Sequence, residues 1–260
     1  MIRHYTPAAG AKVRIISDLH YGHEKCQAPA PRQLLGMMQG VDVLIVAGDL
    51  AETRISAWQA RGTALREEMR QCCRDAGIKL IEIAGNHDPD IPDQMLSLWG
   101  GQVIVIHGHQ LFDEIAPWGW EYLDDKQGCK DFIAQFPERS FKLSQRLQLA
   151  QQLSERVRPK LHRKKKFGIK LIDHALHCFW PPQRPINILM AWATAAPRAE
   201  RFAKTFCPDC DIIVFGHCHR LGKWKKGKRQ LFTTGAWFKH AEPAFVDLID
   251  GQIVRYAKIS

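Results

Sequence analysis

The sequence has no hydrophobic run near the roughly 18 residues that a membrane-spanning helix needs. It also has no apolar stretch of about 7–15 residues near its start, so we expect no secretory signal and a cytoplasmic location. Neither an internal repeat nor a low-complexity linker interrupts the 260 residues, a length that suits one large domain. These absences exclude an integral membrane protein, a repeat array and a small disulfide-stabilised scaffold.

Two segments lack acidic residues altogether. Arg156–Lys170 contains eight Lys or Arg, and Arg220–Arg229 contains six. The chain carries a net charge of +10, but without these fourteen residues 23 basic residues face 27 acidic ones. The two segments therefore predict an anionic partner: a phosphorylated small molecule, a nucleic acid, or an acidic membrane surface contacted peripherally. Trp224 lies among the lysines of the second segment and suggests stacking on a base; a solvated loop is the alternative.

The eight cysteines are scattered, and only one pair has the CxxC spacing. Cys207 and Cys210 could form half of a zinc site or a redox pair, but the sequence has no second CxxC to complete a zinc site. Without a secretory signal we expect reduced cysteines. We therefore interpret this pair as ordinary thiols at a helix-to-strand turn.

Short runs rich in β-branched residues predict buried strands. They are Val13–Ser17, Val43–Ala47, Lys79–Ala84, Val103–Ile106, Asp211–Phe215, Gln230–Thr234, Ala244–Ile249 and Gln252–Ala257. Between the early runs, Ser56–Ala76 has helix length, with Leu65, Met69 and Cys72 on one face and Gly77 after its end. This alternation predicts an α/β fold with a largely parallel sheet that ends in an antiparallel hairpin at Ile249–Gly251.

Residues from about 110 to 208 break the alternation. Leu143, Leu147, Ala150, Leu153 and Val157 share one helical face within 139–157, and a second face with Ile169, Ile172, Leu176 and Phe179 precedes Trp180-Pro-Pro. The strand pattern resumes afterwards. We therefore predict a helical insertion at about 110–208 inside a single domain that spans residues 1–260.

Clusters of polar residues follow five of the predicted strands. They are Ser17-Asp18-Leu19-His20, Gly48-Asp49-Leu50-Ala51-Glu52, Gly85-Asn86-His87-Asp88, His107-Gly108-His109 and Gly216-His217-Cys218-His219. Because the carboxyl ends of parallel strands share one edge of a sheet, the clusters should meet in one crevice. Asp, Asn and neutral His suit Mn²⁺, Fe²⁺ or Zn²⁺, and a central carboxylate such as Asp49 can bridge two ions. Glycines 48, 85, 108 and 216 leave room beside these side chains.

In this order, DLH, GDLAE, GNHD, HGH and GHCH resemble the five signature blocks of the calcineurin-like metallophosphoesterase superfamily. The resemblance covers Asp18 to His219 and implies an α/β/β/α sandwich with two divalent metal ions, Mn²⁺ in first place and Fe²⁺ or Zn²⁺ as alternatives. It implies one metal held by Asp18, His20, Asp49 and His219. It implies a second metal held by Asp49, Asn86, His107 and His217.

The same resemblance implies hydrolysis of a phosphoester, in which a water activated by the metals attacks phosphorus in line with the leaving oxygen. His87 is expected near the leaving group as a general acid or hydrogen-bond donor, with Asp88 fixing its tautomer. Glu52 is expected to orient the metal ligands. His109 should contact substrate or support a ligand, and Arg220, next to His219, should contact phosphate.

The length, the insertion and Thr233–Trp237 are similar to the branch that contains UDP-2,3-diacylglucosamine pyrophosphohydrolase. The chain departs from that branch at His87, where the enzyme has Arg, and in the HQLFDE that follows His107-Gly108. We therefore expect a phosphodiesterase, pyrophosphatase or phosphatase acting on a nucleotide- or lipid-linked substrate. The basic segments suggest a nuclease-like phosphodiesterase as the alternative, and a non-catalytic scaffold of the same fold is a remote one.

Overall fold

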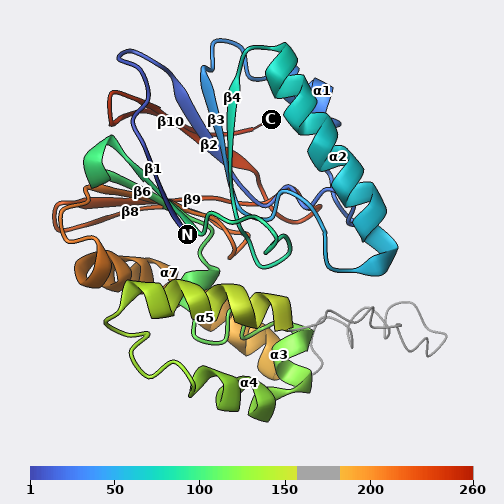
Figure 1. The fold of residues 1–260 in the computed structure, drawn as a ribbon, viewed down its shortest axis with the longest axis vertical. Coiled ribbons are helices and arrows are strands. Elements are labelled where there is room, and N and C mark those ends of the chain that lie inside the picture. The colour runs from blue at the N-terminus through green and yellow to red at the C-terminus, as the bar shows by residue number, and fades with distance from the viewer. Residues whose placement is uncertain (157–181, 260) are drawn as a thin grey trace.

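Two stacked β-sheets form the centre of the protein in the computed structural model, which describes residues 1–156 and 182–259 (Figure 1). The first sheet has the order β1-β5-β6-β7-β9-β8 and the second the order β11-β10-β2-β3-β4. The strands of the first sheet are β1 (Ile2–Tyr5), β5 (Met95–Leu98), β6 (Val103–Ile106), β7 (Ile212–Phe215), β8 (Leu221–Lys226) and β9 (Arg229–Thr234). Those of the second are β2 (Val13–Ile16), β3 (Val43–Ala47), β4 (Lys79–Ile83), β10 (Ala244–Ile249) and β11 (Gln252–Lys258).

All eight predicted strands are confirmed, but they divide between two sheets. β2, β3 and β4 pair in parallel, as do β6, β7 and β9. The antiparallel end of the second sheet is the predicted hairpin β10–β11, whose turn holds Asp250 and Gly251 at positive φ. The expectation of one sheet is therefore corrected to the sandwich that the family resemblance implied.

Helices cover the outer face of each sheet (Figure 1). Helices α1 (Pro31–Gly36) and α2 (Ser56–Asp75) pack on the second sheet, while α5 (Leu143–Arg156) and α7 (Gln183–Phe206) pack on the first. Helix α2 begins at the predicted residue, with Met69 and Cys73 on its buried face, and Cys73 takes the place that Cys72 was expected to have. Because both faces of each sheet are covered, strands such as β3 are buried at every position and read as continuous apolar runs.

Three apolar layers hold the sandwich together. Val13 and Ile45 face Val105 and Val214 between the two sheets. The alternate positions of the same strands, such as Leu44, point outward to α1 and α2. The first sheet contacts Ala195, Ala199 and Phe202 of α7 in the same way. Helix α7 is thus the outer layer of the sandwich.

The predicted helical segment adds a smaller cluster of its own. Helices α3 (Trp120–Asp124) and α4 (Lys126–Ile133) pack with α5 around Cys129, Ile133, Leu149 and Leu153. Helix α5 presents the predicted apolar face, but it begins at Leu143 and not at Arg139. The second predicted helix, at 169–179, and the basic segment beyond Arg156 lie outside the described residues. Short 3₁₀ turns occupy Trp99–Gly101 and His109–Leu111.

The second basic segment is the hairpin β8–β9. Its Trp224 is half-buried and stacks on Phe215, with ring centroids 6.5 Å apart and planes at 16°. One face of this ring thus packs within the protein, and the suggested stacking on a nucleic-acid base stays a prediction. Strand β8 lies at the edge of its sheet, where Lys223 and Lys225 are exposed and disfavour pairing with another chain.

The CxxC pair lies between α7 and β7, as expected for a helix-to-strand turn. Cys207 follows the last residue of α7, and Cys210 is buried just before β7. Burial raises the pKa of the Cys207 thiol to about 12 and raises that of Cys210. Both thiols are free, so they behave as unreactive core groups. Within the described residues, none of the helices has the length and hydropathy of a membrane span.

Candidate metal centre

The five polar clusters meet at one end of the sandwich, with contributions from both sheets. Asp18 and His20 follow β2, Asp49 follows β3, and Asn86 follows β4. From the other sheet, His107 follows β6, while His217 and His219 follow β7. The predicted convergence therefore occurs, and it does so because parallel strands of both sheets end on the same side.

The backbone at these positions is unusual. Asp18, His20, Asp49, His217 and His219 all have φ between 51° and 70°, a region that residues other than glycine rarely adopt. Each turns the chain sharply at the end of a strand and directs its side chain toward the others. Backbone strain of this kind is concentrated at functional sites in proteins.

Glycines beside these residues provide the space that the sequence predicted. A Cβ atom at Gly85 would collide with Asp49, and one at Gly216 would collide with Asp18. At Gly48, where φ is +85°, a Cβ would meet the ring of His107. These glycines are required by the close approach of the polar side chains.

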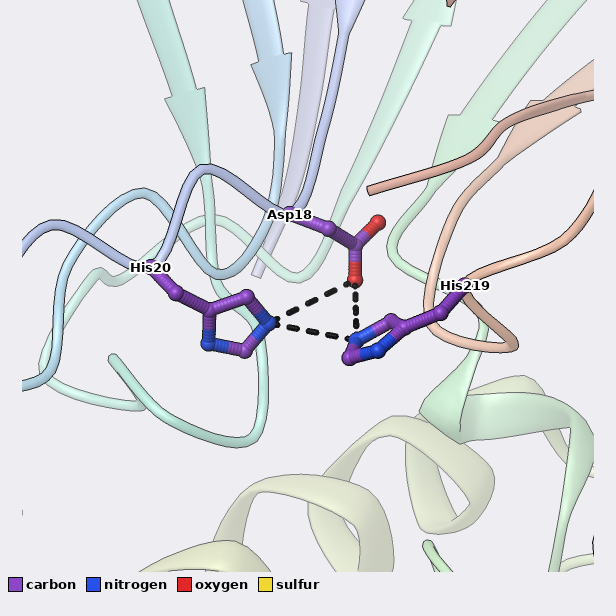
Figure 2. Close-up of side chains that lie close together, drawn as sticks. All are labelled: Asp18, His20 and His219. Carbon is purple, nitrogen blue, oxygen red and sulfur yellow. Dashed lines mark hydrogen bonds and ion pairs between the residues drawn. The ribbon is translucent and has the colours of Figure 1, made fainter. Parts of the chain in front are cut away.

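One group of side chains is formed by Asp18, His20 and His219 (Figure 2). The Nε2 atoms of His20 and His219 lie 3.2 Å apart, and Nε2 of His219 lies 3.3 Å from Oδ1 of Asp18. Nε2 of His20 is 3.9 Å from the same carboxylate oxygen. The three ligand-type atoms thus surround one small space.

A second group is formed by Asp49, His107 and His217. Nε2 of His107 lies 3.1 Å from Oδ2 of Asp49 and 3.3 Å from Oδ1 of Asn86. Oδ2 of Asp49 also lies 3.5 Å from Nε2 of His20, which belongs to the first group. Asp49 therefore stands between the two groups, in the position of a bridging ligand.

The outer hydrogen bonds of the imidazoles suit metal binding. Nδ1 of His107 lies 2.9 Å from the carbonyl oxygen of Ala47, and Nε2 of His217 lies 2.8 Å from that of Ile115. Since a carbonyl oxygen only accepts, each of these nitrogens donates a proton, and the opposite nitrogen faces the centre. Burial lowers the pKa of His107, but the Asp49 and Asp18 carboxylates outweigh it and raise the pKa to about 9, so a bound cation would replace a proton on that ring. Metal-binding histidines are held in this way, so the donor set fits two divalent ions that prefer nitrogen and oxygen ligands.

The two aspartates that accompany these imidazoles are ionised. Asp18 and Asp49 are 0% and 1% exposed. Burial alone would raise the pKa of each carboxyl group, but the neighbouring imidazoles, with His107 the largest contributor, hold both pKa values below their usual range. Two buried negative charges thus lie where cations would be bound.

Glu52 joins this centre to His87. Its carboxylate is completely buried, with Oε1 2.8 Å from Nδ1 of His20 and Oε2 2.8 Å from Nδ1 of His87. Burial lowers the pKa of His87, but the Glu52 and Asp49 carboxylates outweigh it and raise the pKa to about 10. The imidazole is 30% exposed, so His87 is a charged group at the surface of the centre.

Comparison with known proteins identifies the family. A sequence profile described as calcineurin-like phosphoesterase matches residues 11–221, which include all five clusters. The chain belongs to this family. The calcineurin-like phosphoesterases include enzymes that hydrolyse phosphate esters. A search of curated proteins gave no match.

Several solved structures resemble this chain at low sequence identity. A dimetal phosphatase from Danio rerio is 11% identical, with 97% of this chain and 99% of that chain covered and a TM-score of 0.49. A cold-active protein-tyrosine phosphatase from Shewanella is 12% identical, with 100% and 83% covered and a TM-score of 0.46. Vps29 from Entamoeba histolytica in complex with zinc is 12% identical, with 95% and 98% covered and a TM-score of 0.41.

Asp88 does not have the role that the sequence suggested. Its buried carboxylate accepts hydrogen bonds from the backbone N–H groups of Asp49, Leu50, Ala51 and Gly85. The partner of His87 Nδ1 is Glu52. Asp88 therefore ties together the two loops that follow β3 and β4, and Glu52 is the residue that orients the imidazole.

One of the two expected substrate contacts also requires correction. His109 is completely buried behind His107, with ring centroids 5.3 Å apart, so no substrate can reach it. Burial and the neighbouring imidazoles hold the pKa of His109 well below its usual range, so the ring is neutral. Arg220 is exposed, and its guanidinium lies 5.2 Å from the ring centroid of Trp192, so its contact with phosphate stays a prediction.

Three residues at the centre were not found from the sequence. Trp118 lies 5.0 Å from the His217 ring, and Phe238 lies 4.8 Å from that of His20. Arg54 follows Glu52 by two residues and contacts the backbone of Asn86. No motif includes the two aromatic residues, whereas the position of Arg54 two residues after GDLAE was a signal that could have been used.

Proposed function

We propose that the protein is a phosphoester hydrolase that uses two divalent metal ions. Asp18, His20, Asp49 and His219 would hold one ion, and Asp49, Asn86, His107 and His217 the other. The observation that carries this proposal is Asp49, a buried carboxylate between two groups of nitrogen and oxygen ligands. We propose Mn²⁺ as the first candidate and Fe²⁺ or Zn²⁺ as alternatives, since all three suit such ligands.

The protein's own residues would prepare the reaction in distinct ways. Bound ions would supply Lewis-acid polarisation of the phosphate and a lower pKa for water. Asp18 and Asp49 would keep negative charge at the centre, and Glu52 would fix the tautomer of His20. His87, held through Nδ1 by Glu52, has Nε2 left to donate a proton to the leaving oxygen. The exposed edge of this ring supports that role.

The substrate proposed is a phosphodiester, pyrophosphate or phosphomonoester linked to a nucleotide or a lipid. Two features support a substrate larger than phosphate itself. The insertion reaches the centre, where Trp118 lies beside His217, and Phe238 adds an aromatic wall beside His20. A substrate like that of UDP-2,3-diacylglucosamine pyrophosphohydrolase, which is linked to both a nucleotide and a lipid, is one candidate. A cytoplasmic location is part of this proposal.

Replacement of Asp49 tests the proposal. Asp49→Asn keeps the shape but removes the bridging charge, so metal-dependent hydrolysis of model phosphoesters should fall by at least about 10²-fold. Asp211→Asn, at the opposite end of β7, is the matched control and should keep full activity. The wild type would be assayed on a phosphomonoester, a phosphodiester and a nucleotide pyrophosphate with Mn²⁺, Mg²⁺ and Zn²⁺ in turn. Full activity of Asp49→Asn would refute the mechanism.

The same assays separate the alternatives. Cleavage of RNA or DNA with Mn²⁺, together with affinity that falls steeply with salt, would favour the nuclease-like phosphodiesterase. A purified protein that retains no metal and cleaves none of the model esters would favour the non-catalytic scaffold. The bond that is cleaved fastest would define the substrate class.

A further inference from the structure

Arg54 lies between the metal centre and the insertion. It follows β3 and immediately precedes Ile55, the N-cap residue of α2. Its Nη1 atom donates to the carbonyl oxygen of Asn86 at 3.5 Å, and Nη2 donates to that of Glu155 at 3.2 Å. The half-buried guanidinium thus joins the loop of a candidate metal ligand to the last turn of α5.

The charge of Arg54 has no direct counter-charge. Both acceptors are neutral carbonyl oxygens, and among residues 1–156 and 182–259 no carboxylate lies within ion-pair distance of this guanidinium. Two other arginines with little exposure do have a carboxylate partner. Arg14 is paired with Asp247 at 2.7 Å, and Arg66 with Asp90 at 2.6 Å. A partly desolvated cation without such a partner is costly, and an arriving anion would remove that cost.

Carboxylates of the metal centre act on the charge of the Arg54 guanidinium. Burial lowers the pKa of Arg54, while Glu121, Glu155, Glu52 and Asp49 oppose that shift. Two of these acids, Glu52 and Asp49, belong to the metal centre. By its contacts with Asn86 and Glu155, Arg54 carries a positive charge between the metal centre and the insertion, whereas Arg220 is exposed and lies over the ring of Trp192.

We infer that Arg54 binds the phosphoryl oxygens of the substrate next to Asn86. This inference deepens the proposed function and rests on it. The two carbonyl contacts orient the planar guanidinium and leave further N–H groups for an anion, and charge-assisted bonds from arginine to phosphate oxygens are strong and directional. Because one contact is to Glu155, binding of the phosphoryl group and the position of α5 are linked through the same side chain.

The test measures binding of inorganic phosphate to the Mn²⁺-loaded protein by calorimetry. Arg54→Gln should weaken phosphate affinity by about 10–100-fold. Arg54→Lys keeps the positive charge but loses the planar pair of N–H donors, so its phosphate affinity should lie between those of Arg54→Gln and the wild type. Arg61→Gln removes one exposed positive charge from α2 and should leave the affinity unchanged. With a p-nitrophenyl phosphodiester, KM should rise more than kcat falls.

Two further measurements separate binding from folding. The melting temperature and the Mn²⁺ stoichiometry of Arg54→Gln should match those of the wild type, because the lost contacts are two long bonds to carbonyl oxygens. Unchanged phosphate affinity in Arg54→Gln would overturn the inference, as would an equal loss in Arg61→Gln. A wild type that binds no Mn²⁺ and hydrolyses no ester would instead refute the proposed function, so the two failures are distinguishable.

Discussion

The exchange of Glu52 for Gln should affect metal binding and turnover separately. Each oxygen of the buried carboxylate lies 2.8 Å from Nδ1 of a histidine, His20 on one side and His87 on the other. Glutamine has the same shape but offers one acceptor and one donor. One of the two imidazoles must then face an N–H group and move its proton to Nε2.

The expected size of each effect depends on which of the two imidazoles changes its tautomer. If His20 changes, its Nε2 loses the lone pair that points toward Asp18 and His219, and metal affinity should fall by about 10–100-fold. His87 also loses the anion that keeps its pKa high, so turnover at saturating metal should fall by about 10²–10⁴-fold. Calorimetric titration with Mn²⁺ measures the first effect, and kcat at saturating Mn²⁺ measures the second.

Glu82→Gln is the matched control for this exchange. Glu82 lies on β4, and its carboxylate forms an ion pair with Arg70 at 2.6 Å. Loss of the Glu82 charge should change neither Mn²⁺ affinity nor kcat. If Glu52→Gln kept both quantities within about threefold of the wild type, the inference that Glu52 orients the two histidines would be refuted.

Two other outcomes test the centre without kinetics. Removal of metal by a chelator should lower the melting temperature followed by circular dichroism. Mn²⁺ at about 1,000 times its dissociation constant should restore about 4 kcal/mol of unfolding free energy, or about 8–16 °C in melting temperature. No shift would show that the folded protein does not bind the ion. Gly85→Ala should reduce Mn²⁺ affinity because its Cβ would collide with Asp49, whereas Gly36→Ala, which meets open space, should not; equal affinities would refute the packing argument.

Most of the strands that the sequence predicted are buried along nearly their whole length, with β11 as an exception. Strands such as β3 and β6 are covered on both faces, so their apolar runs are unmistakable. Strands β1 and β8 were missed because exposed or charged residues interrupt their apolar pattern. Strand β5, Met-Leu-Ser-Leu, is too short to show a period. Its position between β1 and β6 could not be foreseen, since it depends on long-range pairing.

At the centre, motifs predicted which residues meet but not how they are connected. Asp88 is next to His87 in the sequence, which suggested contact, yet its carboxylate is occupied by four backbone N–H groups. Glu52 reaches His87 from another strand. His109 has a motif position but no access to solvent. Residues that are neighbours in the sequence thus need not be in contact, because successive side chains point in different directions.

The carbonyl oxygen of Ile115 is the acceptor for His217 and belongs to the segment that enters the helical insertion. A residue of the insertion, outside the five clusters, therefore supports one of the candidate metal ligands. Shortening the insertion, or replacing it with that of a relative, would alter the basicity of this imidazole along with the shape of the entrance. If the proposed function holds, an exchange of the insertion designed to change only the substrate should also change the metal affinity.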